Sequence, residues 1–164
     1  MNELPLFETS QMLTSVLPPF LLRCGVAALC GALVGLERER KQKPAGFRTN
    51  ILICVGSAIY MMIGLLLANS GGQSGVDATR IAAQVVTGIG FLGAGCIIQN
   101  GGRVMGLTSA ATIWVVAGIG LVAGAGFPLL ALIAAIGVWL TLVVLGEFER
   151  RFLERSTEPA DAPN

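Results

Sequence analysis

Few residues of this chain could do chemistry, and no combination of them forms a recognisable catalytic set. The sequence has no histidine, which excludes a Ser/His/Asp or Cys/His relay, an HExxH zinc helix and an imidazole proton shuttle. The four cysteines, Cys24, Cys30, Cys54 and Cys96, lie in apolar runs without CxxC spacing. In such runs cysteine behaves as a small buried hydrophobe. We therefore expect a protein that is not an enzyme and holds no metal or other cofactor.

One motif matches a nucleotide-binding turn letter for letter. Residues 88–93 read Gly-Ile-Gly-Phe-Leu-Gly and fit the GxGxxG fingerprint of dinucleotide-binding proteins. That fingerprint requires a preceding strand and an acidic residue about 20 positions later. No Asp or Glu occurs between Asp77 and Glu147. We reject the match, because glycines in an apolar segment also let the helices of a membrane protein approach one another.

The composition indicates a membrane protein. Of the 164 residues, 54% are hydrophobic and 13% are charged, whereas soluble domains carry about 25% charged residues. No charge interrupts residues 49–76, 81–102 and 104–146, and about 20 apolar residues are enough to cross a bilayer as a helix. With 11 basic and 10 acidic side chains, the chain also lacks the basic surface that binds nucleic acid.

We expect an all-α fold, a polytopic membrane bundle of five transmembrane helices at about 17–36, 50–68, 80–98, 107–124 and 128–146. The connections after the first and third spans and the C-terminal tail together hold nine Lys and Arg residues, whereas the opposite side has Arg80, with Arg23 just inside the first span. Because Lys and Arg concentrate in cytoplasmic loops, this bias predicts an N-terminus outside and a C-terminus in the cytoplasm.

The two ends of the chain complete the predicted organisation. No Lys or Arg occurs before Arg23, so a cleaved signal peptide is not expected. A five-span transmembrane domain over 1–146 is followed by an amphipathic juxtamembrane helix over 147–155, in which Glu147 and Arg151 have favourable i,i+4 spacing. Residues 156–164 are expected to be a disordered tail, since they include two prolines and little that could pack.

The glycines of the third span lie on two faces of its helix. Gly88 and Gly95 share one face, and Gly90 and Gly93 lie on the opposite one. This pattern predicts that the third span lies between two neighbours at the centre of the bundle. Further candidates for close packing are the pairs Gly31/Gly35 in the first span and Gly120/Gly124 in the fourth.

A polar line follows the same helix. It consists of Asp77, Arg80, Gln84, Gly88, Gly95 and Gln99, which fall within about 60° of one another on a helical wheel. One interpretation is a face buried in the bundle with its polar groups paired internally, and the other is a path for a solute or a proton. Two points favour the first: no carboxylate lies inside the hydrocarbon on any span, and a hydrated divalent cation requires several oxygen ligands.

The first two spans resemble the next two. Arg23 and Arg80 each precede a glycine by eight residues, and the following loops read Gly-Phe-Arg-Thr at 46–49 and Gly-Leu-Thr-Ser at 106–109. A parallel duplication would place Arg23 at the outer end of its helix, where it extends outward or pairs with Asp77. The tryptophans near the middle of their spans, Trp114 and Trp139, are expected to pack inside the bundle.

The loop over 35–49 is the most charged part of the chain. Glu37 and Arg38 end one helix and residues 48–49 begin the next, so the hairpin brings ion-pair candidates together at the inner mouth of the bundle. We expect a fixed network there, in which replacement of Glu37 or Arg48 costs more than replacement of Lys41 or Lys43.

Three segments together resemble one family. They are GLERERKQKPAGFRTN at 35–50, DATRIAAQVVTGIGFLGAG at 77–95 and GLTSAATIW at 106–114. These segments are similar to the MgtC/SapB family of bacterial inner-membrane proteins. Ala78, Ser109 and Asn50 depart from the residues common in that family. Many members continue into a soluble cytoplasmic domain similar to ACT domains, and this chain stops at Asn164, so the resemblance covers the membrane domain alone.

The resemblance implies a function in growth at low magnesium and, in pathogens, in survival inside host cells. It implies a non-enzymatic regulator in the lipid bilayer that restrains the F-type ATP synthase or contacts other inner-membrane proteins. The alternative is a small ion or solute transporter, working as a homo-oligomer through the polar face of the third span. By match to the family motifs, the candidate functional residues are Glu37, Arg38, Pro44, Gly46, Arg48, Thr49, Asp77, Arg80, Gln84, Thr108, Thr112 and Trp114. The residue patterns add Arg23, Gly88 and Gly93.

Overall fold

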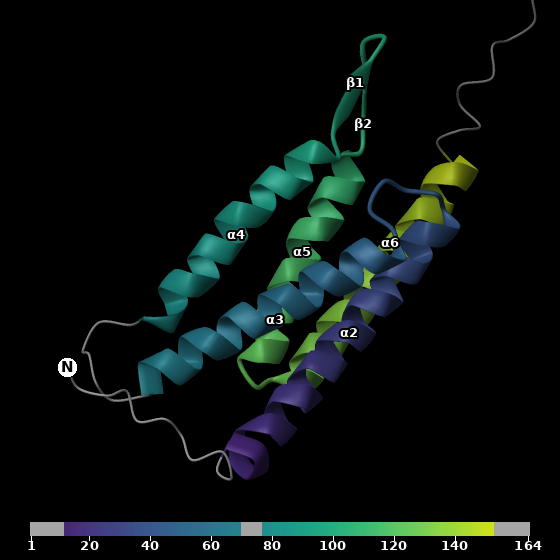
Figure 1. The fold of residues 1–164 in the computed structure, drawn as a ribbon. Coiled ribbons are helices and arrows are strands. Elements are labelled where there is room, and N and C mark those ends of the chain that lie inside the picture. Colours follow the sequence, from purple (N-terminus) through teal and green to yellow (C-terminus); the bar gives the residue numbers. More distant parts are fainter. Residues whose placement is uncertain (1–11, 70–76, 153–164) are drawn as a thin grey trace, which may run out of the picture.

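The computed structural model describes residues 12–69 and 77–152 (Figure 1). Its elements follow the chain in this order: the π-helical turn η1 (Met12–Val16), α2 (Leu17–Arg40), α3 (Phe47–Asn69), α4 (Ala78–Gly95), β1 (Ile98–Asn100), β2 (Arg103–Met105), α5 (Leu107–Gly124) and α6 (Pro128–Phe152). Successive long helices run in opposite directions (Figure 1). The predicted all-α polytopic bundle is confirmed, with the hairpin β1–β2 as its one addition within these ranges.

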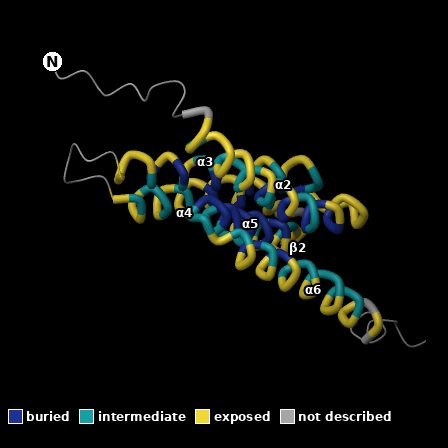
Figure 2. The backbone as a smooth tube through the Cα atoms, turned by 90° about the horizontal axis from the view of Figure 1, so that it is seen from below, coloured by how far each residue is buried: buried dark blue, intermediate teal, exposed yellow. Residues whose placement is uncertain are grey.

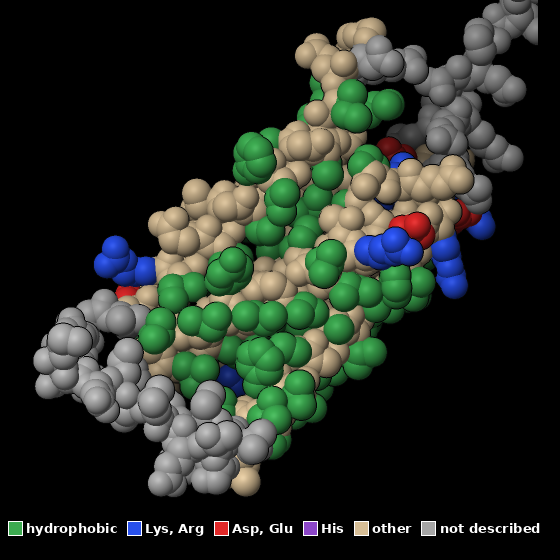
Figure 3. Space-filling view, in the orientation of Figure 1, with side chains coloured by type: hydrophobic (Ala, Val, Ile, Leu, Met, Phe, Trp, Pro, Cys, Tyr) green, Lys and Arg blue, Asp and Glu red, His purple; other side chains and the backbone are tan. Residues whose placement is uncertain are grey.

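Four of the described helices are long and apolar enough to cross a membrane, namely the helix over Thr14–Arg40, α3, α5 and α6 over Pro128–Glu149. Apolar side chains cover the visible flank of the bundle, and its charged side chains gather toward the ends (Figure 3). The third predicted span, α4, is not among the four, although it is 18 residues long, as α5 is. Arg80 and Gln84 lower its mean hydropathy.

The core lies where α2, α3 and α5 meet (Figure 2). α5 packs against α2, α3, α4 and α6 and is therefore the central helix. Small side chains fill much of this core, and Cys30 and Cys54 are fully buried among them. All four cysteines are free thiols. Cys30 and Cys54 therefore serve as the small buried hydrophobes that the sequence predicts.

Glycines bring the core helices close together at the two predicted pairs. A Cβ added at Gly31 would lie 2.7 Å from a backbone carbonyl oxygen of α3, and one added at Gly35 would lie 2.9 Å from an α3 Cα. A Cβ at Gly120 or Gly124 would overlap backbone carbonyl oxygens of α3. No larger residue fits at these contacts without moving a helix backbone, so the close packing predicted for both pairs is confirmed.

The central position predicted for the third span is wrong. α4 lies at the edge of the bundle against α3 and α5 (Figures 1 and 2), and its buried residues are Ile89 and Gly93. Gly93 faces α5, since a Cβ there would lie 3.6 Å from Ala110. A Cβ at Gly88 or Gly90 would meet no atom within 4 Å. The glycine pattern predicts two packed faces, but among these three glycines only Gly93 packs against a neighbouring helix.

α4, the third predicted span, also ends three residues earlier than predicted, at Gly95 instead of residue 98. After Gly95 the chain forms an antiparallel hairpin in which Asn100 lies opposite Arg103. Gly101 and Gly102 make its two-residue turn with φ of +56° and +81°, values that a type I′ turn requires and that glycine adopts readily. Gln99 belongs to β1, so its predicted place on the polar line of the helix is wrong.

Two helical hairpins, α2–α3 and α4–α5, are arranged as the proposed duplication would place them. Gly35 lies against Asn50 in the first hairpin, and Gly93 lies against Ala110 in the second. The two contacts are related by shifts of 58 and 60 residues along the chain, close to the shifts that relate the sequence motifs. The motif pair Gly31 and Gly88 does not follow this arrangement, because Gly31 packs against α3 and a Cβ at Gly88 would meet no atom within 4 Å. The duplication therefore stays a prediction.

α6 is a single continuous helix through Phe152, and Arg151 Nε pairs with Glu147 Oε1 at 2.8 Å. The predicted juxtamembrane helix thus begins as an extension of the last span. The predicted tail at 156–164 and residues 1–11, where a cleaved signal peptide is not expected, lie outside the described residues.

Candidate functional site

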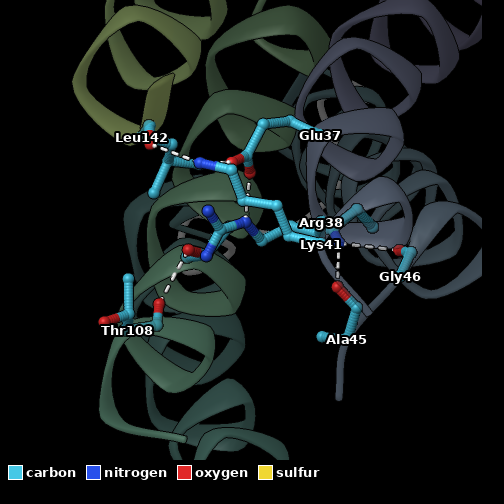
Figure 4. A network of polar contacts seen from close by, with 9 residues as sticks. Glu37, Arg38, Lys41, Ala45, Gly46, Thr108 and Leu142 are labelled. Carbon is cyan, nitrogen blue, oxygen red and sulfur yellow. Dashed lines mark hydrogen bonds and ion pairs between the residues drawn. The ribbon is translucent and has the colours of Figure 1, made fainter. Parts of the chain in front are cut away.

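A buried ion cluster closes the end of the bundle that carries the basic loop (Figure 4). Arg38 Nε donates to Glu37 Oε2, and Lys41 Nζ lies 2.8 Å from Glu37 Oε1. The side chains of Glu37 and Arg38 are only 5% and 3% exposed. Lys41 Nζ also donates to the Leu142 carbonyl oxygen of α6 at 3.3 Å. The cluster thus compensates a buried carboxylate with two cations and connects the end of α2 to α6.

A second set of hydrogen bonds shapes the loop between α2 and α3. The Asn50 amide nitrogen donates to the carbonyl oxygens of Ala45 at 2.9 Å and Gly46 at 2.8 Å. Glu39 Oε2 accepts the Phe47 backbone N–H at 2.8 Å and so satisfies a free donor at the start of α3. A Cβ at Gly46 would overlap the Glu39 carboxylate, so a larger residue there would displace this side chain from the Phe47 N–H.

Sequence reasoning missed Glu39 and Asn50 as residues that hold the loop, and it misplaced Arg48. Arg48 and Thr49 are exposed on the first turn of α3, whereas Asn50 faces α2 near Gly35. Residues two apart on a helix do not share a face, so Arg48 points outward while Asn50 points inward. The expected participation of Arg48 in the network is wrong, and Lys41 takes part in its place.

The start of α5 lies beside this cluster. Thr112 is buried and its hydroxyl donates to the Thr108 carbonyl oxygen at 2.7 Å. Thr108 is exposed and borders a cavity that Arg38 also lines. Pro44 is exposed in the loop. Trp114 is 55% exposed, so its predicted packing inside the bundle is wrong, and its ring lies on the outer surface of α5.

Charges at the opposite end of the bundle stay near the surface. Asp77 is exposed and its Oδ1 accepts the Thr79 backbone N–H at 2.8 Å, which caps α4. Hydrogen bonds from Thr79, with a smaller contribution from Arg80, lower the pKa of Asp77 below its ordinary 3.8. Arg23 does not pair with Asp77. Its Nη1 donates to the Gly124 carbonyl oxygen at 2.9 Å, where a cation stabilises the C-terminus of α5.

A groove of about 630 Å³ separates α3 from α4. Arg80, Gln84 and Gly88 line it from α4, and Ser57 and Tyr60 are among the residues that line it from α3. The other lining side chains are apolar. The predicted polar line is therefore neither buried nor internally paired over this stretch. It forms one wall of a groove on the flank of the bundle.

The groove lies between two adjacent helices and does not run through the interior of the bundle. Among the described residues, no group of three or more His, Cys, Asp or Glu side chains could hold a metal ion. Gln84 is exposed on α4, and an amide exposed to lipid favours pairing with a polar group of another helix. The arrangement suits contact with a partner helix better than coordination of a cation.

Apolar helices joined by short connections, with ionic groups at both ends, define a polytopic α-helical membrane protein. The model of the MgtC family matches residues 24–151. The chain therefore belongs to the MgtC family and is a multi-pass bacterial membrane protein.

Curated relatives extend this match over most of the chain. The Escherichia coli K12 protein named "Putative magnesium transporter YhiD" is 40% identical over 140 residues, which cover 84% of this chain and 65% of YhiD. Protein MgtC of Salmonella typhimurium LT2 is 43% identical over 133 residues, which cover 81% of this chain and 55% of MgtC. The match thus spans between about half and two thirds of these relatives. No solved structure matches the chain significantly.

Proposed function

We propose that the chain is a non-enzymatic regulator of the MgtC type in the bacterial inner membrane, which acts by docking against helices of other membrane proteins. The groove between α3 and α4 is the observation that carries this proposal. It exposes Arg80, Gln84 and Gly88 on the flank of the bundle, and the space above Gly88 is open. A helix that fills the groove would cover Gln84 and gain close backbone contact at the glycine.

The setting that we propose is adaptation to low magnesium. Membership of the MgtC family and the name of the relative YhiD, a putative magnesium transporter, support the link to magnesium. As partner we propose a helix of the membrane sector of the F-type ATP synthase, whose proton-driven rotation the docked chain would restrain. The basic loop between α2 and α3 is proposed to face the cytoplasm, because nine of the eleven Lys and Arg residues fall on that side.

Photocrosslinking from the groove tests this function. A photoreactive amino acid in place of Tyr60, which lines the groove from α3 and is 59% exposed, is expected to crosslink to a membrane subunit of the ATP synthase in living cells, because it leaves the space above Gly88 open. The same amino acid at Ile133, which is 57% exposed on α6, serves as the control that faces lipid. Crosslinks of equal yield from both positions, or none from position 60 in correctly inserted protein, would contradict the proposal.

A small transporter is the second candidate, and Arg80 and Gln84 in the groove favour it. Two copies whose grooves face each other would enclose a polar path for an ion or solute. Purified protein in liposomes tests this alternative directly through the flux of Mg²⁺, protons and anions. Flux that disappears in Gln84→Leu or Arg80→Ala would establish the transporter and overturn the regulator.

A further inference from the structure

A second cavity, of about 650 Å³, lies at the end of the bundle that carries the basic loop. It is formed by the end of α2 with the following loop, the first turn of α5 and the last turns of α6. It shares no lining residue with the groove between α3 and α4. Its chemistry can therefore be considered independently of the docking proposal.

One wall of this cavity is cationic. Arg38 is 3% exposed, and its Nε is engaged by Glu37. Within residues 12–69 and 77–152 its two terminal nitrogens make no hydrogen bond, and the guanidinium borders the cavity beside Thr108 (Figure 4). Lys41 and Lys43 line the same wall. The N-terminal turn of α5 at Thr108 adds the partial positive charge of its backbone N–H groups.

The facing wall belongs to α6 and has the opposite character. Glu149 and Glu147 line the cavity there, and Arg151 already pairs with Glu147 at 2.8 Å. Leu142 and Leu145, which precede the two acidic residues on α6, line the same wall. A simple anion would be attracted by the Lys and Arg side chains of the first wall but repelled by the Glu149 carboxylate opposite. The cavity suits a ligand that carries both signs of charge.

The position of the cavity points to the membrane interface. The apolar part of α6 ends near Glu149, and the charged end of α2 lies at the same end of the bundle. The cavity therefore lies at the level of the lipid headgroups. Leu142 and Leu145 form the apolar side of the cavity along α6. The acyl chains of a bound lipid would lie against this side, toward the hydrocarbon.

We propose that this cavity binds the headgroup of a zwitterionic phospholipid of the phosphoethanolamine type. The phosphate lies toward Arg38 and Lys43, with the Thr108 hydroxyl as a further donor, and the ammonium group lies toward Glu149. Charge-assisted hydrogen bonds on both walls give this headgroup an advantage over an anionic one of similar size. The bound lipid would join α2, α5 and α6 at one end of the bundle.

Native mass spectrometry of the full chain in detergent tests the site with phosphatidylethanolamine and phosphatidylglycerol of identical acyl chains. We expect phosphatidylethanolamine to bind about tenfold more tightly, the size of effect that one charge-assisted hydrogen bond produces. Glu149→Gln should remove this preference, and Lys43→Gln should weaken the binding of both lipids. Arg48→Gln is the matched control, because Arg48 is exposed on the same end of the bundle and does not line the cavity.

Two results would overturn the assignment. Equal binding of the two lipids to the wild type, or an unchanged preference in Glu149→Gln, would show that the acidic wall does not recognise the ammonium group. Displacement of the lipid by soluble glycerophosphoethanolamine at equal concentration would show that the site takes a free phosphate ester and not a membrane lipid. Circular dichroism of each variant confirms that the chain is folded before binding is compared.

Discussion

Glycines serve opposite purposes on the two sides of this bundle. Four glycines of α2 and α5 lie against the backbone of α3, where an added Cβ would clash, namely Gly31, Gly35, Gly120 and Gly124. On the α4 side, Gly88 and Gly90 face open space. The same residue type therefore marks a completed helix contact in one region and an unfilled one in the other. We relate the unfilled contact to the proposed docking function.

The charged ends of the bundle differ in a similar way. Glu37, Arg38 and Lys41 form a largely buried cluster that links two helices. Asp77 at the other end caps its own helix and is exposed. Loss of a charge should therefore destabilise the whole bundle at the Glu37 cluster, but only the first turn of α4 at Asp77.

Replacement of Glu37 should have the largest effect. Glu37→Gln leaves Arg38 buried without its counter-charge, which we expect to lower the free energy of unfolding by about 3–5 kcal/mol. Lys41→Gln should cost less than about 1 kcal/mol, because the Lys41 side chain is 42% exposed. Thermal unfolding in detergent, followed by circular dichroism, measures both. Equal costs for the two variants, or a larger cost for Arg48→Gln, would contradict the buried cluster.

The packed glycines come next. Gly120→Ala places a Cβ into a backbone carbonyl oxygen of α3, and overpacking of this kind costs about 1–3 kcal/mol. Gly118→Ala is the matched control two residues earlier on α5, where a Cβ meets no atom within 4 Å. Because Ala favours helix over Gly by up to about 1 kcal/mol, the control should be neutral or stabilising. Melting temperatures that move in the same direction would disprove the contrast between packed and open glycines.

An open glycine of α4 should tolerate a large residue without loss of the fold. Gly88→Leu points into the groove, where a Cβ has no neighbour within 4 Å, so we expect the free energy of unfolding to stay the same or to rise by up to about 1 kcal/mol from helix propensity. Docking should nevertheless be lost, because leucine occupies the place of the partner helix. A strongly destabilised Gly88→Leu protein would show that α4 packs more closely than described.

The smallest predicted effect concerns Asp77. Its lowered pKa means that the carboxylate cap contributes fully at neutral pH and that this contribution disappears as the pH falls below about 3.8. Asp77→Asn keeps a capping side chain but should remove this pH dependence. Melting temperatures of the two proteins between pH 7 and pH 3 provide the measurement. The account of the cap is wrong if the wild type loses no more stability than Asp77→Asn over that range.

Sequence reasoning was sufficient for elements that depend on composition and local chemistry. The apolar runs placed the helices, and the glycine pairs at 31/35 and 120/124 identified real contacts. The Asn-Gly-Gly sequence at 100–102 is also typical of a hairpin turn, but it lies in the predicted connection between the third and fourth spans, where an all-α fold leaves no place for strands. These features are encoded over a few residues and do not depend on the arrangement of the helices.

The arrangement of the helices could not be predicted, because a helix with two glycine faces fits the centre of a bundle and an unpartnered edge equally well. The edge position of α4 and the outward direction of Arg48 follow from contacts with distant helices. The participation of Glu39 in capping α3 likewise depends on how the loop folds back over eight residues. Only the three-dimensional structure supplies this information.

The central claim is that the groove of α4 docks a helix and that this contact restrains the ATP synthase. ATP-driven proton pumping in inverted membrane vesicles measures it most directly, with wild type, Gly88→Leu and the control Gly118→Leu present at equal amounts. We predict that the wild type and Gly118→Leu lower the rate of pumping and that Gly88→Leu leaves it at the level of vesicles without the protein. Equal inhibition by Gly88→Leu and the wild type would contradict the claim.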